Sequence, residues 1–300
     1  MYSIAGVVAV LQIPFLPDGE VDWEGLKKIA VFATENGASA VAFGYASEFP
    51  KLDTAEREQA LLTAVQACEG RVPVVAWCAA ESTRVASRLV RRSRELGASM
   101  AVVTPPPGAE SFAQVRRHLH ELTQEGLPLV LQDAPEWSRV HLSVEQLCEL
   151  CTTPGVIGLK VESQPTWVRV RAVRQQLGKH VTVLGGFGGL YLCAELAAGS
   201  DGVMPGSAHP WVFANVIRAF RQGREESALE QYRNLLPYLV VSSHRLDDFI
   251  WIQKEILRRL GVIQSSSLRQ PGEAPDDFTL RLALSLAERL GLLAGAQGVG

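Results

Sequence analysis

One lysine of the chain lies where a lysine is costly to bury. Lys160 stands inside GVIGLKVES, where apolar residues such as Leu159 alternate along the chain as they do in a buried strand. A buried ammonium group is disfavoured, and loss of its proton makes the amine nucleophilic towards a carbonyl carbon. The position therefore predicts either a lysine that forms a Schiff base or a structural lysine paired with a carboxylate such as Glu162 or Asp133. The other five lysines lie in segments typical of helices, loops or helix flanks.

Other catalytic motifs are missing from the sequence. No GxSxG, HExxH or GKS/GKT string occurs, and GGFGG at 185–189 lacks the GxGxxG spacing. Cys148 and Cys151 form a CxxC pair, but no second pair completes a zinc site, so we expect two ordinary helix residues. Five cysteines are an odd number in a chain large enough to fold without disulfides, which favours a reducing cytoplasm. No metal or other cofactor is therefore expected.

Eight short apolar runs alternate with longer amphipathic segments over the first two thirds of the chain. This alternation is typical of βα units with a parallel sheet, and eight units close a barrel more readily than an open sheet. Four amphipathic segments end at a glycine suited to a helix C-cap, namely Gly37, Gly70, Gly97 and Gly126. The predicted strands are IAGVVAVLQ, SAVAFG, VPVVAWC, SMAVVTP, LPLVLQD, VIGLKVE, VTVLGG and DGVMPG. We therefore predict an α/β fold of the (β/α)8 TIM barrel type.

The remainder of the chain has a different pattern. Three helical periodicities follow the eighth unit, over residues 225–241, 246–260 and 277–293. We therefore expect a catalytic barrel over residues 1–222 and a C-terminal helical extension of the same domain over residues 223–300.

Composition limits the partners of the protein. The formal net charge of -3 is small, and basic residues are scattered among acidic ones, so we expect no nucleic acid partner. No apolar run reaches the length of a membrane helix, and the apolar first residues lack the basic leader and cleavage site of a signal peptide. The sequence thus favours a cytoplasmic protein that acts on a small molecule and not on a membrane.

A family resemblance rests on several short strings in a fixed order. These are PFLPDGEVDWEGL, FGYASEFPKLDTAER, VTPPP, LQDAP, GLKVES and GGFGG. Together they resemble the dihydrodipicolinate synthase and N-acetylneuraminate lyase family of class I aldolases, from the first strand to the final helices. The resemblance implies that Lys160 forms the Schiff base with a 2-oxo acid and that the protein is a homodimer or homotetramer.

The resemblance also assigns the loop GYASEF to the substrate carboxylate. Ala46 and Ser47 would supply the donors, since compact backbone amides at a turn bind anions. The alternative is an ordinary turn in which Ser47 acts as a cap. Glu48 is expected to be a structural hydrogen-bonding residue. Gly186, after the seventh strand, either lets the backbone approach the substrate or only shapes the turn. Met204, at the eighth strand, is expected to contact substrate.

The chain departs from the family pattern at the proton relay. The family has a tyrosine on strand five, where this chain has Gln132, whose carboxamide does not exchange a proton at accessible pH. A second tyrosine after strand four is also missing, because Thr104 is followed by Pro105. We expect Tyr45, or a water held by Gln132, to move protons, unless Tyr45 is only an aromatic wall.

These features favour an imine-forming lyase, either an aldolase or a dehydratase, on a small 2-oxo acid. The QDAP variant is similar to branches that dehydrate 2-keto-3-deoxy sugar acids. Two alternatives stay open: a pyruvate-dependent retro-aldol lyase or dihydrodipicolinate synthase-like enzyme, and a barrel that binds 2-oxo acids without turnover.

Overall fold

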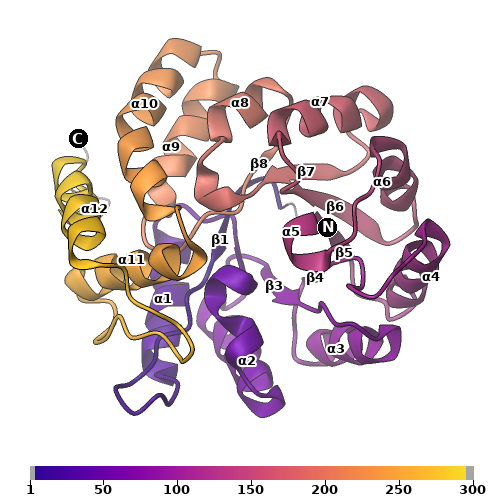
Figure 1. Ribbon diagram of the computed structural model, residues 1–300, viewed down its shortest axis with the longest axis horizontal. Helices are drawn as coiled ribbons and strands as arrows, with labels where there is room; N and C mark the ends of the chain where they lie inside the picture. Colours follow the sequence, from indigo (N-terminus) through magenta and orange to yellow (C-terminus); the bar gives the residue numbers. More distant parts are fainter. Residues whose placement is uncertain (1–3, 295–300) are drawn as a thin grey trace.

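The computed structural model describes residues 4–294 of the chain. Within this range eight parallel strands form a closed barrel in chain order, and β1 pairs with β8 to complete it (Figure 1). The predicted (β/α)8 fold is confirmed. The strands are β1 (Gly6–Val10), β2 (Ala40–Ala42), β3 (Val74–Trp77), β4 (Met100–Val103), β5 (Leu129–Asp133), β6 (Val156–Val161), β7 (Thr182–Gly185) and β8 (Gly202–Val203).

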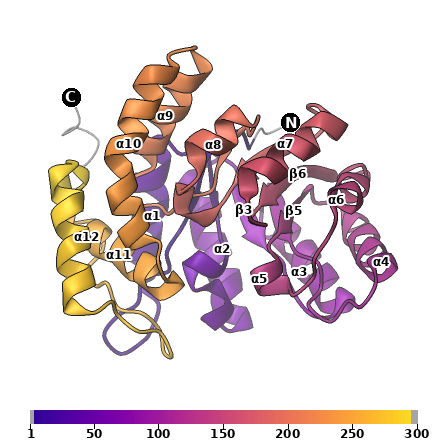
Figure 2. The same cartoon turned by 45° about the horizontal axis from the view of Figure 1, so that its top comes forward.

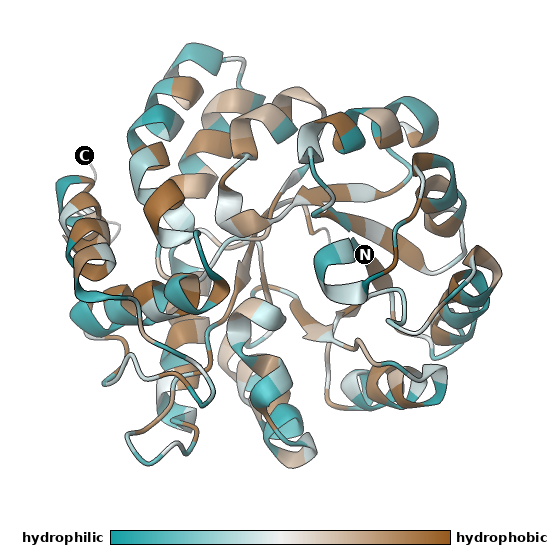
Figure 3. Cartoon of the chain, in the orientation of Figure 1, coloured by the Kyte–Doolittle hydropathy of each residue, from teal (hydrophilic) through white to brown (hydrophobic). Residues whose placement is uncertain are grey.

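Helices surround the barrel and connect successive strands (Figures 1 and 2). Apolar colours concentrate on the central strands, and polar colours lie on the outer turns of the helices (Figure 3), as burial of one helix stripe requires. The helices of the barrel are α1 (Trp23–Glu35), α2 (Thr54–Cys68), α3 (Thr83–Glu95), α4 (Phe112–Thr123), α5 (Pro135–Ser138), α6 (Val144–Cys151), α7 (Thr166–Leu177), α8 (Leu192–Ala197) and α9 (Pro210–Arg221).

Local signals set the ends of several helices. Asp53 and Glu56 form a reciprocal capping box at the start of α2. The four glycines predicted to follow helices, Gly37, Gly70, Gly97 and Gly126, all have φ between 73° and 97°, a region that suits glycine, so this prediction is confirmed. Cys148 and Cys151 are buried, unpaired residues of α6, as predicted.

The C-terminal extension consists of α10 (Glu225–Ser242), α11 (Leu246–Arg259) and α12 (Asp277–Arg289), followed by the short turn η4 (Leu292–Ala294). These helices match the three predicted periodicities. α12 lies beside α10 at the edge of the molecule (Figures 1 and 2), while α11 contacts the 3-10 turn η1 (Tyr45–Ser47) after β2. The division of the chain after residue 222 stays a prediction. In residues 4–294, none of the helices has the length and apolarity of a membrane span.

Candidate active site

The C-terminal ends of the strands surround a cavity of about 220 Å³. Its walls come from the ends of β1, β2 and β4 to β8, and the connection between α10 and α11 closes one side. This is the end of the barrel at which enzymes of the fold carry their active sites. Lys160, Gln132, Tyr45, Ala46 and Met204, all predicted site residues, line the cavity.

Three polar side chains meet on the floor of this cavity. Lys160 Nζ lies 3.1 Å from Glu162 Oε1, and both side chains are mostly buried, at 13% and 14% exposure. Gln132 Nε2 donates to Glu162 Oε2 at 2.5 Å. Gln132 and Lys160 are register partners on β5 and β6, so the sheet itself sets their spacing. The lysine is thus in direct contact with a carboxylate that can take or return a proton.

Strand geometry explains why Glu162 and not Asp133 is the partner of Lys160. Lys160 and Glu162 are two residues apart, so both side chains lie on the same face of the strand. Asp133 follows Gln132 and faces the other way, where its Oδ2 lies 2.5 Å from Arg169 Nε. Burial raises the pKa of Asp133, and the charge of Arg169 opposes this effect.

Gly186 has a different role from the substrate contact that the sequence predicted. It does not appear in the wall of the cavity, and a Cβ atom there would lie 2.3 Å from Glu162 Oε1. Its missing side chain therefore makes room for Glu162. The next residue, Phe187, has a φ of 48° and donates its amide to Glu162 Oε1 at 3.4 Å, which further fixes the carboxylate.

Tyr45 forms an aromatic wall beside the cavity. Its ring stacks on Trp137 at a centroid distance of 4.6 Å and meets Trp77 edge-on at 5.1 Å. Burial and then the charge of Glu162 raise the pKa of Tyr45 above its usual value of 10.0. The ring is thus held in place with a neutral phenol at ordinary pH.

Ala46 and Ser47, which were both predicted to bind the substrate carboxylate, lie in different surroundings in the loop after β2. Ala46 lines the cavity, and its carbonyl accepts a hydrogen bond from Gln12 Nε2 at 3.2 Å. Ser47 is buried outside the lining, and its hydroxyl accepts from the Gly44 amide at 3.1 Å. The geometry of Ser47 corresponds to the alternative that the sequence left open, a serine that holds the turn.

From the sequence, Glu162 was considered only as a structural partner of Lys160. The residues of the α10–α11 connection that line the cavity were not predicted at all. The two-residue spacing from Lys160 was a signal for Glu162, because it places both side chains on one face. Ser243, His244 and Arg245 line the cavity from the α10–α11 connection. Nothing local in the sequence connects these residues with the ends of the barrel strands.

The described residues contain no cluster of histidine, cysteine and acidic side chains that could hold a metal ion.

The fold and the site define a (β/α)8 barrel with a lysine–carboxylate pair at the mouth. Residues 3–280 match the dihydrodipicolinate synthetase family, and the chain belongs to this family. The resemblance seen in the short strings is thereby confirmed.

Two relatives of the chain have names that give different activities. The chain is 32% identical to a 4-hydroxy-tetrahydrodipicolinate synthase of Stenotrophomonas maltophilia over 67% of this chain and 68% of the relative. It is 26% identical to an L-2-keto-3-deoxyarabonate dehydratase of Azospirillum brasilense over 95% and 94%. The structure is similar to dihydrodipicolinate synthase from Rhodopseudomonas palustris, with a TM-score of 0.88, 26% identity and coverage of 95% and 97%.

Proposed function

We propose that the protein is an imine-forming dehydratase that acts on a 2-keto-3-deoxy sugar acid. The observation that carries this proposal is the contact of 3.1 Å between Lys160 and Glu162 at the end of β6. A nucleophilic lysine must lose a proton before it attacks a carbonyl, and a carboxylate at this distance can accept that proton.

The reaction begins with attack of the Lys160 amine on the C2 carbonyl carbon of the substrate. Glu162 then gives the proton that it took from Lys160 to the C2 oxygen, and loss of water from the addition product leaves an iminium ion, which acidifies the hydrogens on C3. Glu162 removes one C3 proton, and the electron pair forms an enamine. The C4–O bond then breaks, C3 and C4 become doubly bonded, and the leaving hydroxide takes the proton from Glu162 as water. Hydrolysis of the unsaturated imine releases the product and the free lysine.

Gln132 favours elimination over the aldol chemistry of the synthases. Its amide donates to Glu162 and orients the carboxylate, but it does not exchange a proton at accessible pH. One carboxylate that first takes and then returns a proton suffices for elimination of water. The similarity to the Azospirillum dehydratase extends over almost the whole chain, which supports the same choice.

The cavity offers different groups to the two ends of such a substrate. The carboxylate is assigned to the loop at Ala46, next to the wall formed by Tyr45. The distal hydroxyls are assigned to the α10–α11 connection, where the buried Ser243 hydroxyl has no hydrogen-bond partner among the described residues. A buried hydroxyl of this kind is available to a ligand. Family likeness further supports a homodimer or homotetramer. The five free cysteines support a location in the reducing cytoplasm.

The second candidate is a pyruvate-dependent aldolase or retro-aldol lyase. It is favoured by the similarity to the Stenotrophomonas synthase. The two reactions differ in their products, because aldol cleavage releases pyruvate whereas elimination releases water and an unsaturated or semialdehyde product.

A panel of 2-keto-3-deoxy sugar acids, followed by proton NMR, tests the proposal. We expect the wild type to give the dehydrated product. Glu162→Gln should lose on the order of 100-fold or more of the turnover rate, while it still forms the imine at a lower rate. Glu121→Gln, an exposed helix variant, is the control. Release of pyruvate from the same acids would transfer the assignment to the aldolase, and imine formation without any product would favour the binding protein.

A further inference from the structure

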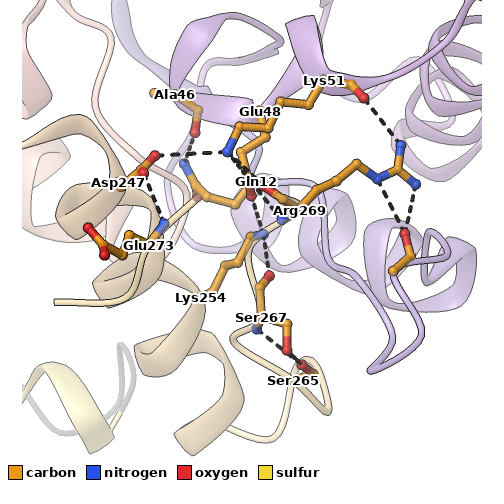
Figure 4. Close-up of polar contacts among 11 residues, drawn as sticks. Gln12, Ala46, Glu48, Lys51, Asp247, Lys254, Ser265, Ser267, Arg269 and Glu273 are labelled. Carbon is orange, nitrogen blue, oxygen red and sulfur yellow. Dashed lines mark hydrogen bonds and ion pairs between the residues drawn. The ribbon is translucent and has the colours of Figure 1, made fainter. Parts of the chain in front are cut away.

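Two buried charges lie behind the loop of residues 44–51, which carries Tyr45 and Ala46 and is called the substrate loop below. Glu48 follows η1, and Lys254 is on α11, 206 residues further along the chain. Their side chains form an ion pair in which both are fully buried. Figure 4 shows side chains of the substrate loop, α11 and residues 265–269 converging on this pair. The pair therefore joins the C-terminal extension to the loop that carries Tyr45 and Ala46.

The polar atoms of the pair have further partners. Glu48 Oε1 accepts from Lys51 Nζ at 2.9 Å and from the Arg269 amide at 3.0 Å. Lys254 Nζ also donates to the Ser267 carbonyl at 2.8 Å and lies 4.5 Å from the centroid of the Phe15 ring. Both charges thus have several partners within the protein, as a buried ion pair requires.

The segment that supplies these backbone groups is itself attached to the barrel. Arg269 donates to both carboxylate oxygens of Glu56 on α2, at 2.6 and 2.7 Å, and to the Gly19 carbonyl at 2.8 Å. Lys51 donates to the Arg269 carbonyl at 2.9 Å. Residues 265–269 therefore bridge α11, α2 and the substrate loop.

The pair acts on the part of the loop that faces the cavity. Glu48 has a φ of 60°, in the left-handed region, and its amide donates to the Tyr45 carbonyl at 2.9 Å. A non-glycine residue keeps such a conformation only when its surroundings hold it. The side chain of Glu48 is held by Lys254 and the Arg269 amide, so the turn that presents Tyr45 and Ala46 depends on the C-terminal extension.

Stability alone does not account for this arrangement. Burial lowers the pKa of Lys254 to about 8, although Glu48 favours the charged form. Replacing a buried ion pair with apolar residues of similar volume is often neutral or stabilising. A role in fixing the geometry of the loop is the better explanation of two full charges at a fully buried site.

We propose that Glu48 and Lys254 are positioning residues, whose buried pair lets the C-terminal extension hold Tyr45 and Ala46 at the carboxylate end of the substrate. The inference rests on the proposed function, since it assumes that a 2-oxo acid binds at this loop. It adds to that function a dependence of substrate binding on α11 and residues 265–269, neither of which supplies the nucleophile.

The test uses the full chain and two measurements. Lys160 is trapped with pyruvate and borohydride over a range of pyruvate concentrations, and hydrogen exchange of the backbone amides is followed without ligand. The variants are Lys254→Met, Arg269→Ala and the double variant Glu48→Gln/Lys254→Met. Arg91→Met is the matched control, because it breaks the ion pair of 2.8 Å between Arg91, an exposed residue of α3, and Glu125 in the turn after α4.

We expect Lys254→Met to raise the half-saturating pyruvate concentration by about 10- to 100-fold, because misplaced binding groups cost roughly that much. The fraction trapped at saturation should stay within about twofold, because the Lys160–Glu162 contact is untouched. Exchange should accelerate together in residues 44–51 and 265–273, and Arg269→Ala should show the same pattern more weakly. The double variant removes both fully buried charges and leaves only the partly exposed Lys51 without its glutamate, so it should recover stability but not pyruvate affinity.

Three results would overturn the proposal. The first is an unchanged half-saturation in a folded Lys254→Met or Arg269→Ala variant, even if its melting temperature falls. The second is acceleration of exchange in only one of the two segments. The third is full recovery of affinity in the double variant. A wild type that traps no 2-oxo acid would instead refute the proposed function, and the exchange pattern would still decide whether the loop and the extension are coupled.

Discussion

Glu195 on α8 offers a quantitative test of how the barrel is packed around the site. Its side chain is fully buried behind β7, and a Cβ atom at Gly185 would lie 1.8 Å from its Oε2 atom. Burial raises the pKa of Glu195 to about 7; the charge of Glu162 adds to this effect, and the Thr166 hydroxyl opposes it. The folded protein therefore prefers the protonated acid at a pH where an unfolded glutamate is charged.

The size and sign of the effect follow from the two pKa values. The interval from 4.5 to about 7 corresponds to about 3 kcal/mol, at about 1.4 kcal/mol per pH unit. The stabilising contribution of the raised pKa is present in full below pH 4.5 and is lost as pH rises through about 7. Linkage over this interval gives a loss of about 2 kcal/mol between about pH 5.5 and about pH 8.

Glu195→Gln removes this titration and keeps the shape of the side chain. We expect its free energy of urea unfolding, relative to wild type, to rise by about 2 kcal/mol between about pH 5.5 and about pH 8. Glu121→Gln, at an exposed position of α4, should follow the wild-type profile at both values. A constant difference between Glu195→Gln and wild type over this range would refute the reasoning, because it would mean that Glu195 is charged in the folded state.

Three further predictions concern the cavity and its surroundings. Gly186→Ala should displace Glu162, since the new Cβ would lie 2.3 Å from Oε1, and steady-state kinetics should show a fall of about 10-fold or more in kcat with an unchanged trapped imine. Arg169→Met should lower the free energy of urea unfolding by about 3 kcal/mol, because it leaves the buried Asp133 carboxylate unpaired; an effect below about 1 kcal/mol would show that the pair is not needed. Tyr45→Phe should retain at least about a third of kcat if Glu162 carries the protons, and a loss of about 100-fold would return that role to Tyr45.

The sequence was most informative about the buried strands and about Lys160, the one lysine that lies in such a strand. Alternation of apolar residues placed Lys160 on a buried strand, and the order of eight such runs predicted the barrel. Both inferences depend on local repeats that a single chain displays directly. The pairing of Lys160 with Glu162 rather than Asp133 also follows from strand periodicity, which places residues two apart on one face.

Long-range partners were not accessible in the same way. Lys254 was grouped with the lysines of helices, loops and helix flanks, because it lies within the helical periodicity of residues 246–260. Its burial depends on Glu48 and on the Ser267 carbonyl, and only the folded chain brings these together. Ser47 shows the same limit on a smaller scale, since the choice between binding substrate and holding the turn depends on where its hydroxyl points.

The most direct test of the account is intact-mass spectrometry after borohydride reduction with pyruvate and with each 2-keto-3-deoxy sugar acid. We predict one reduced adduct per wild-type chain, located at Lys160 by peptide mapping, and none in Lys160→Ala. The adduct should also form in Glu162→Gln, but more slowly, because water must then take the Lys160 proton, and its final yield separates imine formation from the later proton transfers. An adduct of equal yield in Lys160→Ala, or its absence from wild type with every 2-oxo acid, would contradict the central claim that Lys160 forms the Schiff base.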